Sequence, residues 1–145
     1  MALTDVFLTL GEPQFGQLLR SVSMGKLKTY QLYDRLKTRT HVPKLNAEGL
    51  QKATPRLWAR LSEKDEEFAQ DLSQAVLVSH LDMIVAVLNF LGIPHEDGFF
   101  VKDLDAKPFL TEGWRERVLE KFNGVYPEPL LRFYTAHLAW ELLHA

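Results

Sequence analysis

The sequence contains no cysteine among its 145 residues. That absence excludes disulfide frameworks, thiolate zinc sites and cysteine nucleophiles, and it is compatible with a reducing compartment. The first residues, from Met1 to Asp5, lack the basic stretch and the long apolar core of a secretory signal. We therefore expect a cytoplasmic protein.

Familiar catalytic motifs are missing as well. The chain has no Gly-rich phosphate loop, nucleophile elbow, His-Glu-x-x-His motif or calcium loop. We therefore assign no catalytic residue, expect no cofactor, and favour a protein that is not an enzyme.

Only one apolar stretch, residues 75–91, approaches the length of a membrane span, and it contains His80, Asp82 and Asn89. An aspartate near the centre of a bilayer costs about 2.5 to 3.5 kcal/mol on insertion scales. We interpret this stretch as a buried core helix and expect no association with a membrane.

What the sequence does contain is helical periodicity. Phe15, Leu18, Leu19 and Val22 recur at i, i+3, i+4 and i+7, which places them on one face of a helix. No internal repeat, low-complexity tract or flexible linker divides the chain. These features predict an all-α fold, a helical bundle that forms a single domain over residues 1–145.

The central feature of this predicted bundle is one long helix over about residues 62–91. Ser62, followed by Asp65, is typical of a helix start, and no breaker occurs before Gly92. Such a helix would measure about 45 Å, whereas a globule of this size is about 38 Å across. The helix must therefore bend or meet a second subunit, and we expect a homodimer.

A line of polar residues runs along this predicted helix. Steps of 100° per residue place Lys64, Asp71, Asp82 and Asn89 in one narrow band. The band can face solvent, a polar pocket or another subunit, and periodicity does not distinguish these environments.

Histidine and carboxylate residues suggest a polar or metal-binding site. His137, Glu141 and His144 lie at i, i+4 and i+7 of the last predicted helix, and Glu141 with His144 has the spacing of carboxylate metal sites. His80 and Asp82 could supply further ligands from the long helix. The alternative is that these are ordinary surface, capping or core side chains, and in that case no metal is bound.

The segment between residues 20 and 44 is strongly basic. Its candidate phosphate or partner contacts are Lys26, Lys28, Arg35, Lys37 and Arg39. Nucleic-acid binding needs such a density of positive charge, but the isoelectric point of the chain is only 6.2. The segment can instead solvate the protein or pair with the acidic stretch 63–71.

Three functional hypotheses follow from these patterns. The first is a non-catalytic α-helical protein-interaction module that self-associates through the long helix and holds a protein partner. The alternative is a metal-dependent or acid/base enzyme with a site between helices. A further alternative is nucleic-acid binding through the basic segment 20–44, which the near-neutral charge disfavours.

Overall fold

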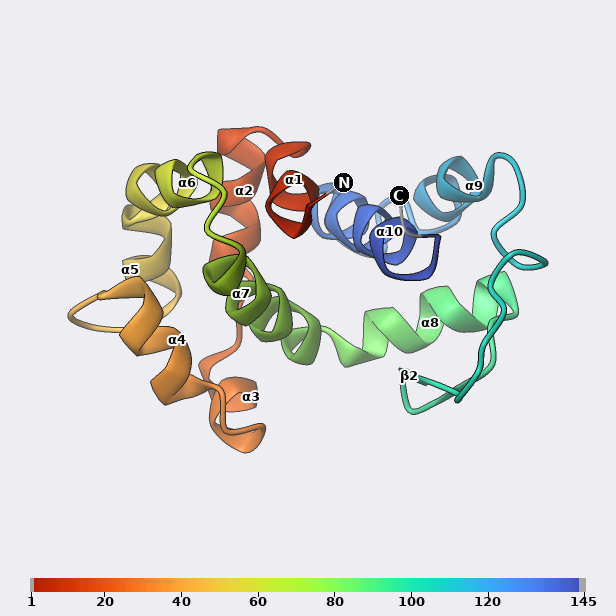
Figure 1. Ribbon diagram of the computed structural model, residues 1–145, viewed down its shortest axis with the longest axis horizontal. Coiled ribbons are helices and arrows are strands. Elements are labelled where there is room, and N and C mark those ends of the chain that lie inside the picture. The colour runs from red at the N-terminus through yellow and green to blue at the C-terminus, as the bar shows by residue number, and fades with distance from the viewer. Residues whose placement is uncertain (1, 144–145) are drawn as a thin grey trace. The chain divides into compact units, whose positions relative to one another are not determined.

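The computed structural model describes residues 2–143, and it confirms the predicted all-α class (Figure 1). The described residues form ten helices and one short hairpin of two strands. The chain divides into two compact units, the first spanning Ala2–Ser79 and the second beginning at His80. Whether the two units act as the predicted single domain stays a prediction.

The N-terminal unit consists of seven helices. They are α1 (Leu3–Leu8), α2 (Glu12–Arg20), α3 (Met24–Thr29), α4 (Tyr33–Thr40), α5 (Ala47–Lys52), α6 (Thr54–Ser62) and α7 (Glu66–Ser79). Helix α2 packs against α5 and α6, while α7 packs against α1, α3 and α4. The predicted apolar face of α2 is confirmed, because Phe15, Leu18 and Leu19 are fully buried.

The C-terminal unit is built from three helices and the hairpin. They are α8 (Leu81–Leu91), β1 (His95–Glu96), β2 (Phe99–Phe100), α9 (Trp114–Lys121) and α10 (Glu128–Leu142). Asp97 and Gly98 connect the antiparallel strands, and both have positive φ, as a tight hairpin turn requires. Helix α9 packs against both α8 and α10.

The predicted continuous helix over residues 62–91 is wrong, because this stretch is interrupted twice. Ser62 does not start a helix but ends α6, and Lys64 follows with φ of 64°. The amides of Lys64 and Asp65 donate to the carbonyls of Leu61 and Arg60, which is the hydrogen-bond pattern of a Schellman C-cap. Asp65 then caps α7, since its carboxylate accepts the amide of Phe68 at 3.0 Å.

The second interruption lies at His80, whose φ of −134° and ψ of 41° are not helical. Just before it, the Ser79 hydroxyl accepts the backbone amide of Ser23 at 2.9 Å and donates to the carbonyl of Ala75. This contact with a residue distant in the sequence lies at the end of α7, where periodicity alone gives no signal. The length argument for a second subunit is lost with the continuous helix, whereas the predicted end at Gly92 is confirmed.

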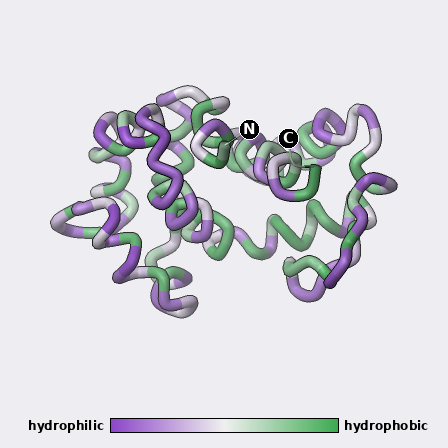
Figure 2. Tube along the Cα trace, viewed as in Figure 1, coloured by the Kyte–Doolittle hydropathy of each residue, from purple (hydrophilic) through white to green (hydrophobic). Residues whose placement is uncertain are grey.

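Hydropathy is distributed unevenly over the helices. Figure 2 shows α8 coloured as hydrophobic along most of its length, in agreement with its sequence LDMIVAVLNFL. No single described helix is long and apolar enough to cross a membrane, and α7 and α8 reach that composition only when they are taken together.

The loop between α4 and α5 lies so close to α5 that only glycine fits at position 49. The Asn46 side chain caps α5 by accepting the amide of Gly49 at 2.6 Å. A Cβ atom at this position would lie 2.5 Å from the carbonyl oxygen of Lys44 and 3.1 Å from Cγ1 of Val42. The backbone of residues 42–46 is therefore held tightly against α5.

We expect Gly49→Ala to lower the free energy of unfolding by about 1 to 3 kcal/mol, because the loop backbone must shift to admit the methyl group. The control is Gly25→Ala in α3, where the nearest atom to the added Cβ is the Ser23 hydroxyl at 3.9 Å. That substitution should be neutral or stabilising, since alanine favours helix. Urea denaturation of both variants checks this, and equal effects would contradict the steric account.

Candidate binding face

Two arginines of α6 cap the C-terminal end of α4. Arg60 donates from Nη1 to the carbonyl oxygen of Arg39, and Arg56 donates from Nη1 to the carbonyl oxygen of Thr40 at 2.6 Å. Helix α4 ends there because His41 adopts the left-handed conformation with φ of 53°. The last carbonyls carry the negative end of the helix dipole, so two guanidinium groups are well placed beside them.

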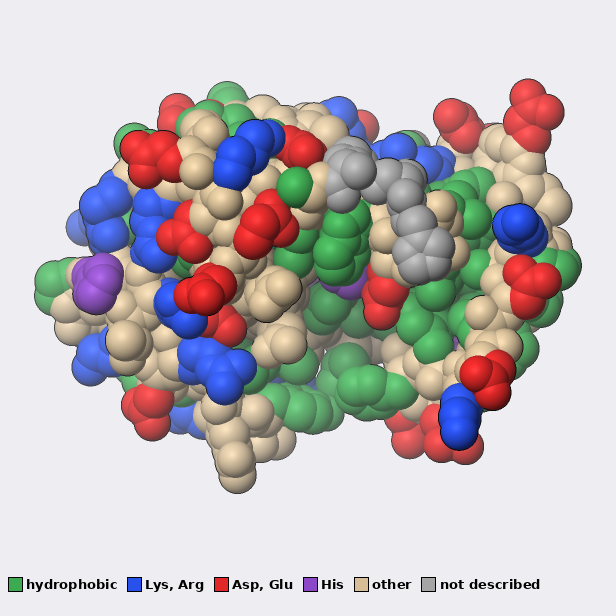
Figure 3. Space-filling view, in the orientation of Figure 1, with side chains coloured by type: hydrophobic (Ala, Val, Ile, Leu, Met, Phe, Trp, Pro, Cys, Tyr) green, Lys and Arg blue, Asp and Glu red, His purple; other side chains and the backbone are tan. Residues whose placement is uncertain are grey.

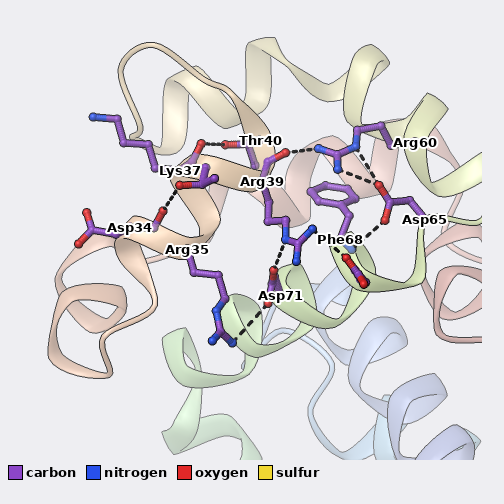
Figure 4. A network of polar contacts seen from close by, with 11 residues as sticks. Asp34, Arg35, Lys37, Arg39, Thr40, Arg60, Asp65, Phe68 and Asp71 are labelled. Carbon is purple, nitrogen blue, oxygen red and sulfur yellow. Dashed lines mark hydrogen bonds and ion pairs between the residues drawn. The ribbon is translucent and has the colours of Figure 1, made fainter.

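Arg60 also connects α6 to the start of α7 (Figure 4). Its Nε and Nη2 atoms donate to one carboxylate oxygen of Asp65, at 3.2 and 2.8 Å. The guanidinium carbon lies 4.4 Å from the centre of the Phe68 ring, a cation–π distance. The amide of Phe68 and, after it, Arg60 hold the pKa of Asp65 below its usual value.

The arginines of α4 pair with carboxylates of α7. Arg39 bonds Asp71 from Nε at 2.9 Å and Glu67 from Nη1 at 3.0 Å. Arg35 lies farther from Asp71, at 3.7 Å. Hydrogen bonding to Asp71 is the main cause that raises the pKa of Arg39. These two arginines of the basic segment therefore pair with the acidic stretch 63–71, which was one of the predicted alternatives.

These contacts surround a shallow depression on the surface of the N-terminal unit, which we call the arginine pocket. Its volume is about 430 Å³, and it is lined by Arg35, Thr38, Arg39, His41 and Arg60. Three guanidinium groups thus face one open space, although each of them already contacts a carboxylate.

Two further depressions continue the positive surface. One of about 570 Å³ includes Lys44, Lys52 and Arg56 in its lining, and another of about 510 Å³ includes Arg20 and again Lys52. Figure 3 shows Lys and Arg side chains gathered at the left of the view, where Figure 1 places α4 and α5. We call the cations that line the three depressions the basic face: Arg20, Arg35, Arg39, Lys44, Lys52, Arg56 and Arg60.

Only part of the predicted basic contacts belongs to this face. Arg35 and Arg39 line the arginine pocket, whereas Lys26, Lys28 and Lys37 line none of the three depressions. Lys28 lies over the Tyr33 ring at 5.0 Å. The predicted segment 20–44 does not include the cations of α5 and α6. A signal for them is present in the sequence, because between residues 20 and 60 there are ten lysines and arginines but only two acidic residues.

The polar line predicted along the long helix is divided by the interruptions. Lys64 precedes α7 and pairs with Asp5, while Asp71 pairs with Arg35 and Arg39. In the C-terminal unit Asp82 is exposed, and Asn89 bonds Nε2 of His95 at 2.7 Å. These residues therefore do not share one environment.

The residues of the predicted metal site come together only in part. His80 lies in the break before α8, Asp82 lies in the first turn of α8, and His144 lies outside the described residues. His137 and Glu141 are neighbours on α10, with Nδ1 and Oε2 separated by 3.5 Å. Within residues 2–143, no three histidine or acidic side chains gather in a way that could hold a metal ion.

His137 is a buried, neutral histidine. Its ring lies between Phe133 and Trp140 of the same helix, with ring centres 5.8 and 5.4 Å away. The separation from Glu141 does not give a hydrogen bond, so Nδ1 lacks a hydrogen-bond partner among the described residues. Burial lowers the pKa of His137 to about 4 and raises the pKa of Glu141.

Comparison with known proteins returns no relative. No protein-family model, no curated protein and no solved structure matches the chain. The function must therefore be inferred from the residues of this chain and their geometry.

We expect Arg60→Ala to lower the free energy of unfolding by about 1 to 3 kcal/mol, since it removes a carbonyl cap, a two-donor carboxylate contact and ring packing at once. The control is Lys52→Ala, which removes an exposed i,i+4 pair with Glu48. That substitution should alter the free energy of unfolding by no more than about 0.5 kcal/mol. Urea denaturation measures the free energy of unfolding of both variants. If Arg60→Ala lost no more of it than Lys52→Ala, the structural role of Arg60 would be refuted.

The buried His137 predicts a loss of stability on mild acidification. The unfolded chain binds the proton near pH 6.5, whereas the folded chain binds it only near pH 4. The neutral His137 therefore makes its full contribution to the free energy of unfolding above pH 6.5 and loses it as the pH falls. The complete loss is about 3 kcal/mol. Glu141 offsets part of it, because a raised carboxyl pKa favours the folded state as the group takes up a proton.

The measurement is a series of urea denaturation midpoints from neutral pH down to about pH 5, where ordinary carboxylates are still mostly ionised. The wild-type midpoint should fall, whereas His137→Gln should give a flatter profile because no imidazole remains to titrate. Parallel profiles for the two proteins would show that His137 is not the group responsible.

Proposed function

We propose that the protein is a non-catalytic α-helical interaction module whose N-terminal unit binds an acidic protein segment on the basic face. The observation that carries this proposal is the basic face itself, where three depressions are each lined by lysine or arginine and two of them share Lys52. Grooves of one charge sign concentrate ligands of the opposite sign and accelerate their encounter.

Several charges of this face remain available for a partner. Within the part of the chain that the structure describes, no ion pair joins Arg20, Lys44 or Arg56 to a carboxylate. Arg56 donates only to a backbone carbonyl, and the Lys52 pair with Glu48 is highly exposed on both sides. Exposed pairs of this kind are worth less than about 1 kcal/mol, so a partner carboxylate can replace them at low cost.

The charge of the surroundings favours a short acidic segment over nucleic acid. Residues 2–79 carry a net charge of only +2, and Glu48 and Glu67 lie at the basic face itself. A nucleic acid carries one charge about every 1.7 Å of duplex and would meet these carboxylates repeatedly. A peptide can place its few carboxylates against the arginines and lysines alone.

Self-association remains a separate proposal. Its original motivation was the length of a continuous helix, and the interruptions at residues 63–65 and His80 remove that argument. The basic face supports a partner of opposite charge, whereas two identical basic faces would repel each other.

The test is a fluorescence anisotropy titration with a short labelled peptide of glutamate and serine. We expect affinity that falls with added salt and that weakens about tenfold or more in the variant Lys52→Glu/Arg56→Glu, because two attractive charges become repulsive. The control is Lys26→Glu in α3, which changes the charge of an exposed lysine that lines none of the depressions.

Equal binding by wild type and by Lys52→Glu/Arg56→Glu would refute the proposal. A single-stranded oligonucleotide serves as the competing probe at the same salt concentration. Tighter binding of the oligonucleotide than of the acidic peptide would instead favour the nucleic-acid alternative.

A further inference from the structure

A small pocket lies between α9 and α10 in the C-terminal unit. It has a volume of about 280 Å³ and is lined by Leu119, Glu120, Asn123, Tyr126, Glu128 and Leu131. Its interior side is apolar, because Leu131 is fully buried and Leu119 and Tyr126 are half-buried. The space suits one large aliphatic or aromatic side chain, and it is too small for a drug-sized ligand.

The loop that joins the two helices is held in a fixed turn at the edge of this pocket. The carbonyl oxygen of Phe122 accepts the amides of Val125 at 2.9 Å and Tyr126 at 3.2 Å, and Gly124 has a φ of 80°. The turn leaves the Val125 side chain 64% exposed. Val125 thus adds an exposed apolar side chain to the surface beside the pocket.

Aromatic rings extend the apolar surface from this turn to α8. Phe122 contacts Tyr126 at 5.7 Å and Phe90 at 5.8 Å between ring centres. Phe90 is 40% exposed, while Phe122 is buried beneath. An incoming apolar side chain would therefore meet a preformed aromatic surface next to the pocket and would require little rearrangement.

The rim of the pocket is acidic. Glu120 and Glu128 belong to the lining, and Glu116 lies one helical turn before Glu120 on the same face of α9. Among residues 2–143, no ion pair is formed by any of these three glutamates. The C-terminal unit as a whole has a net charge of −4.

From this combination we infer that the pocket between α9 and α10 docks a cationic protein segment, which inserts one leucine-sized or aromatic side chain and pairs its lysines or arginines with Glu120 and Glu128. An apolar anchor surrounded by charges of one sign is a common arrangement for recognising an amphipathic peptide. This site differs from the basic face in unit, in charge and in ligand, so it does not rest on the function proposed above.

The experiment uses the full chain and a short labelled peptide that carries leucines four residues apart among lysines. We expect saturable binding by fluorescence anisotropy, weakened about tenfold or more in the variant Glu120→Lys/Glu128→Gln, since the rim loses its negative charge. Both glutamates are exposed, so the variant should remain folded. The control is Glu112→Lys, an exposed residue in the loop before α9, which does not line the pocket.

Three outcomes would overturn the inference. Equal affinity of wild type and Glu120→Lys/Glu128→Gln would exclude the acidic rim, and equal binding of a lysine-only peptide would exclude the apolar anchor. A doubling of the protein mass in light scattering, abolished by the same double substitution, would show that a second copy of the chain occupies the pocket. Binding that requires both leucine and lysine, and is retained in Glu112→Lys, supports the inference.

Discussion

The N-terminal unit depends on a single side chain that joins three of its helices. Arg60 extends from α6 to the carbonyl oxygen of Arg39 in the last turn of α4 and to Asp65, the residue that caps α7. Because its guanidinium also lies on the Phe68 ring, the group satisfies polar atoms while it covers part of the apolar core. The positions of α4 and α7 relative to α6, and with them the arginine pocket, follow from this contact.

The acidic residues of α7 determine which charges of the basic face are paired. The acidic residues that follow α6 neutralise the arginines closest to it, so Arg39 is committed to Asp71 and Glu67. Cations farther from α7, such as Lys44 and Arg20, form no ion pair within the described residues. The acidic stretch therefore neutralises only part of the basic face. It holds the central guanidinium groups in ion pairs and leaves the outer lysine and arginine side chains exposed.

The sequence predicted the parts of this structure that depend on local pattern. The buried stripe of α2 and the end of α8 at Gly92 are confirmed, since side-chain periodicity and glycine at a helix end act within a few residues. The break around Lys64 was missed because local capping, by the Schellman turn after α6 and by Asp65 before α7, competes with a continued helix. The break at His80 was missed because Ser79 bonds Ser23, which is distant in the sequence. The apolar periodicity continues through both breaks and so indicates neither of them.

Prediction of the candidate site was limited by the same cause. Arg35 and Arg39 were identified because they are close together in the sequence, while Arg60 belongs to the site only because α6 packs beside the end of α4. Likewise, Glu120 and Glu128 flank one pocket only because the turn after Phe122 reverses the chain. Charge density along a chain thus indicates the sign of a binding surface, but the tertiary contacts decide which charges a partner can reach. The two units also differ in the sign of their net charge, and substitutions in one unit leave the charges of the other unchanged.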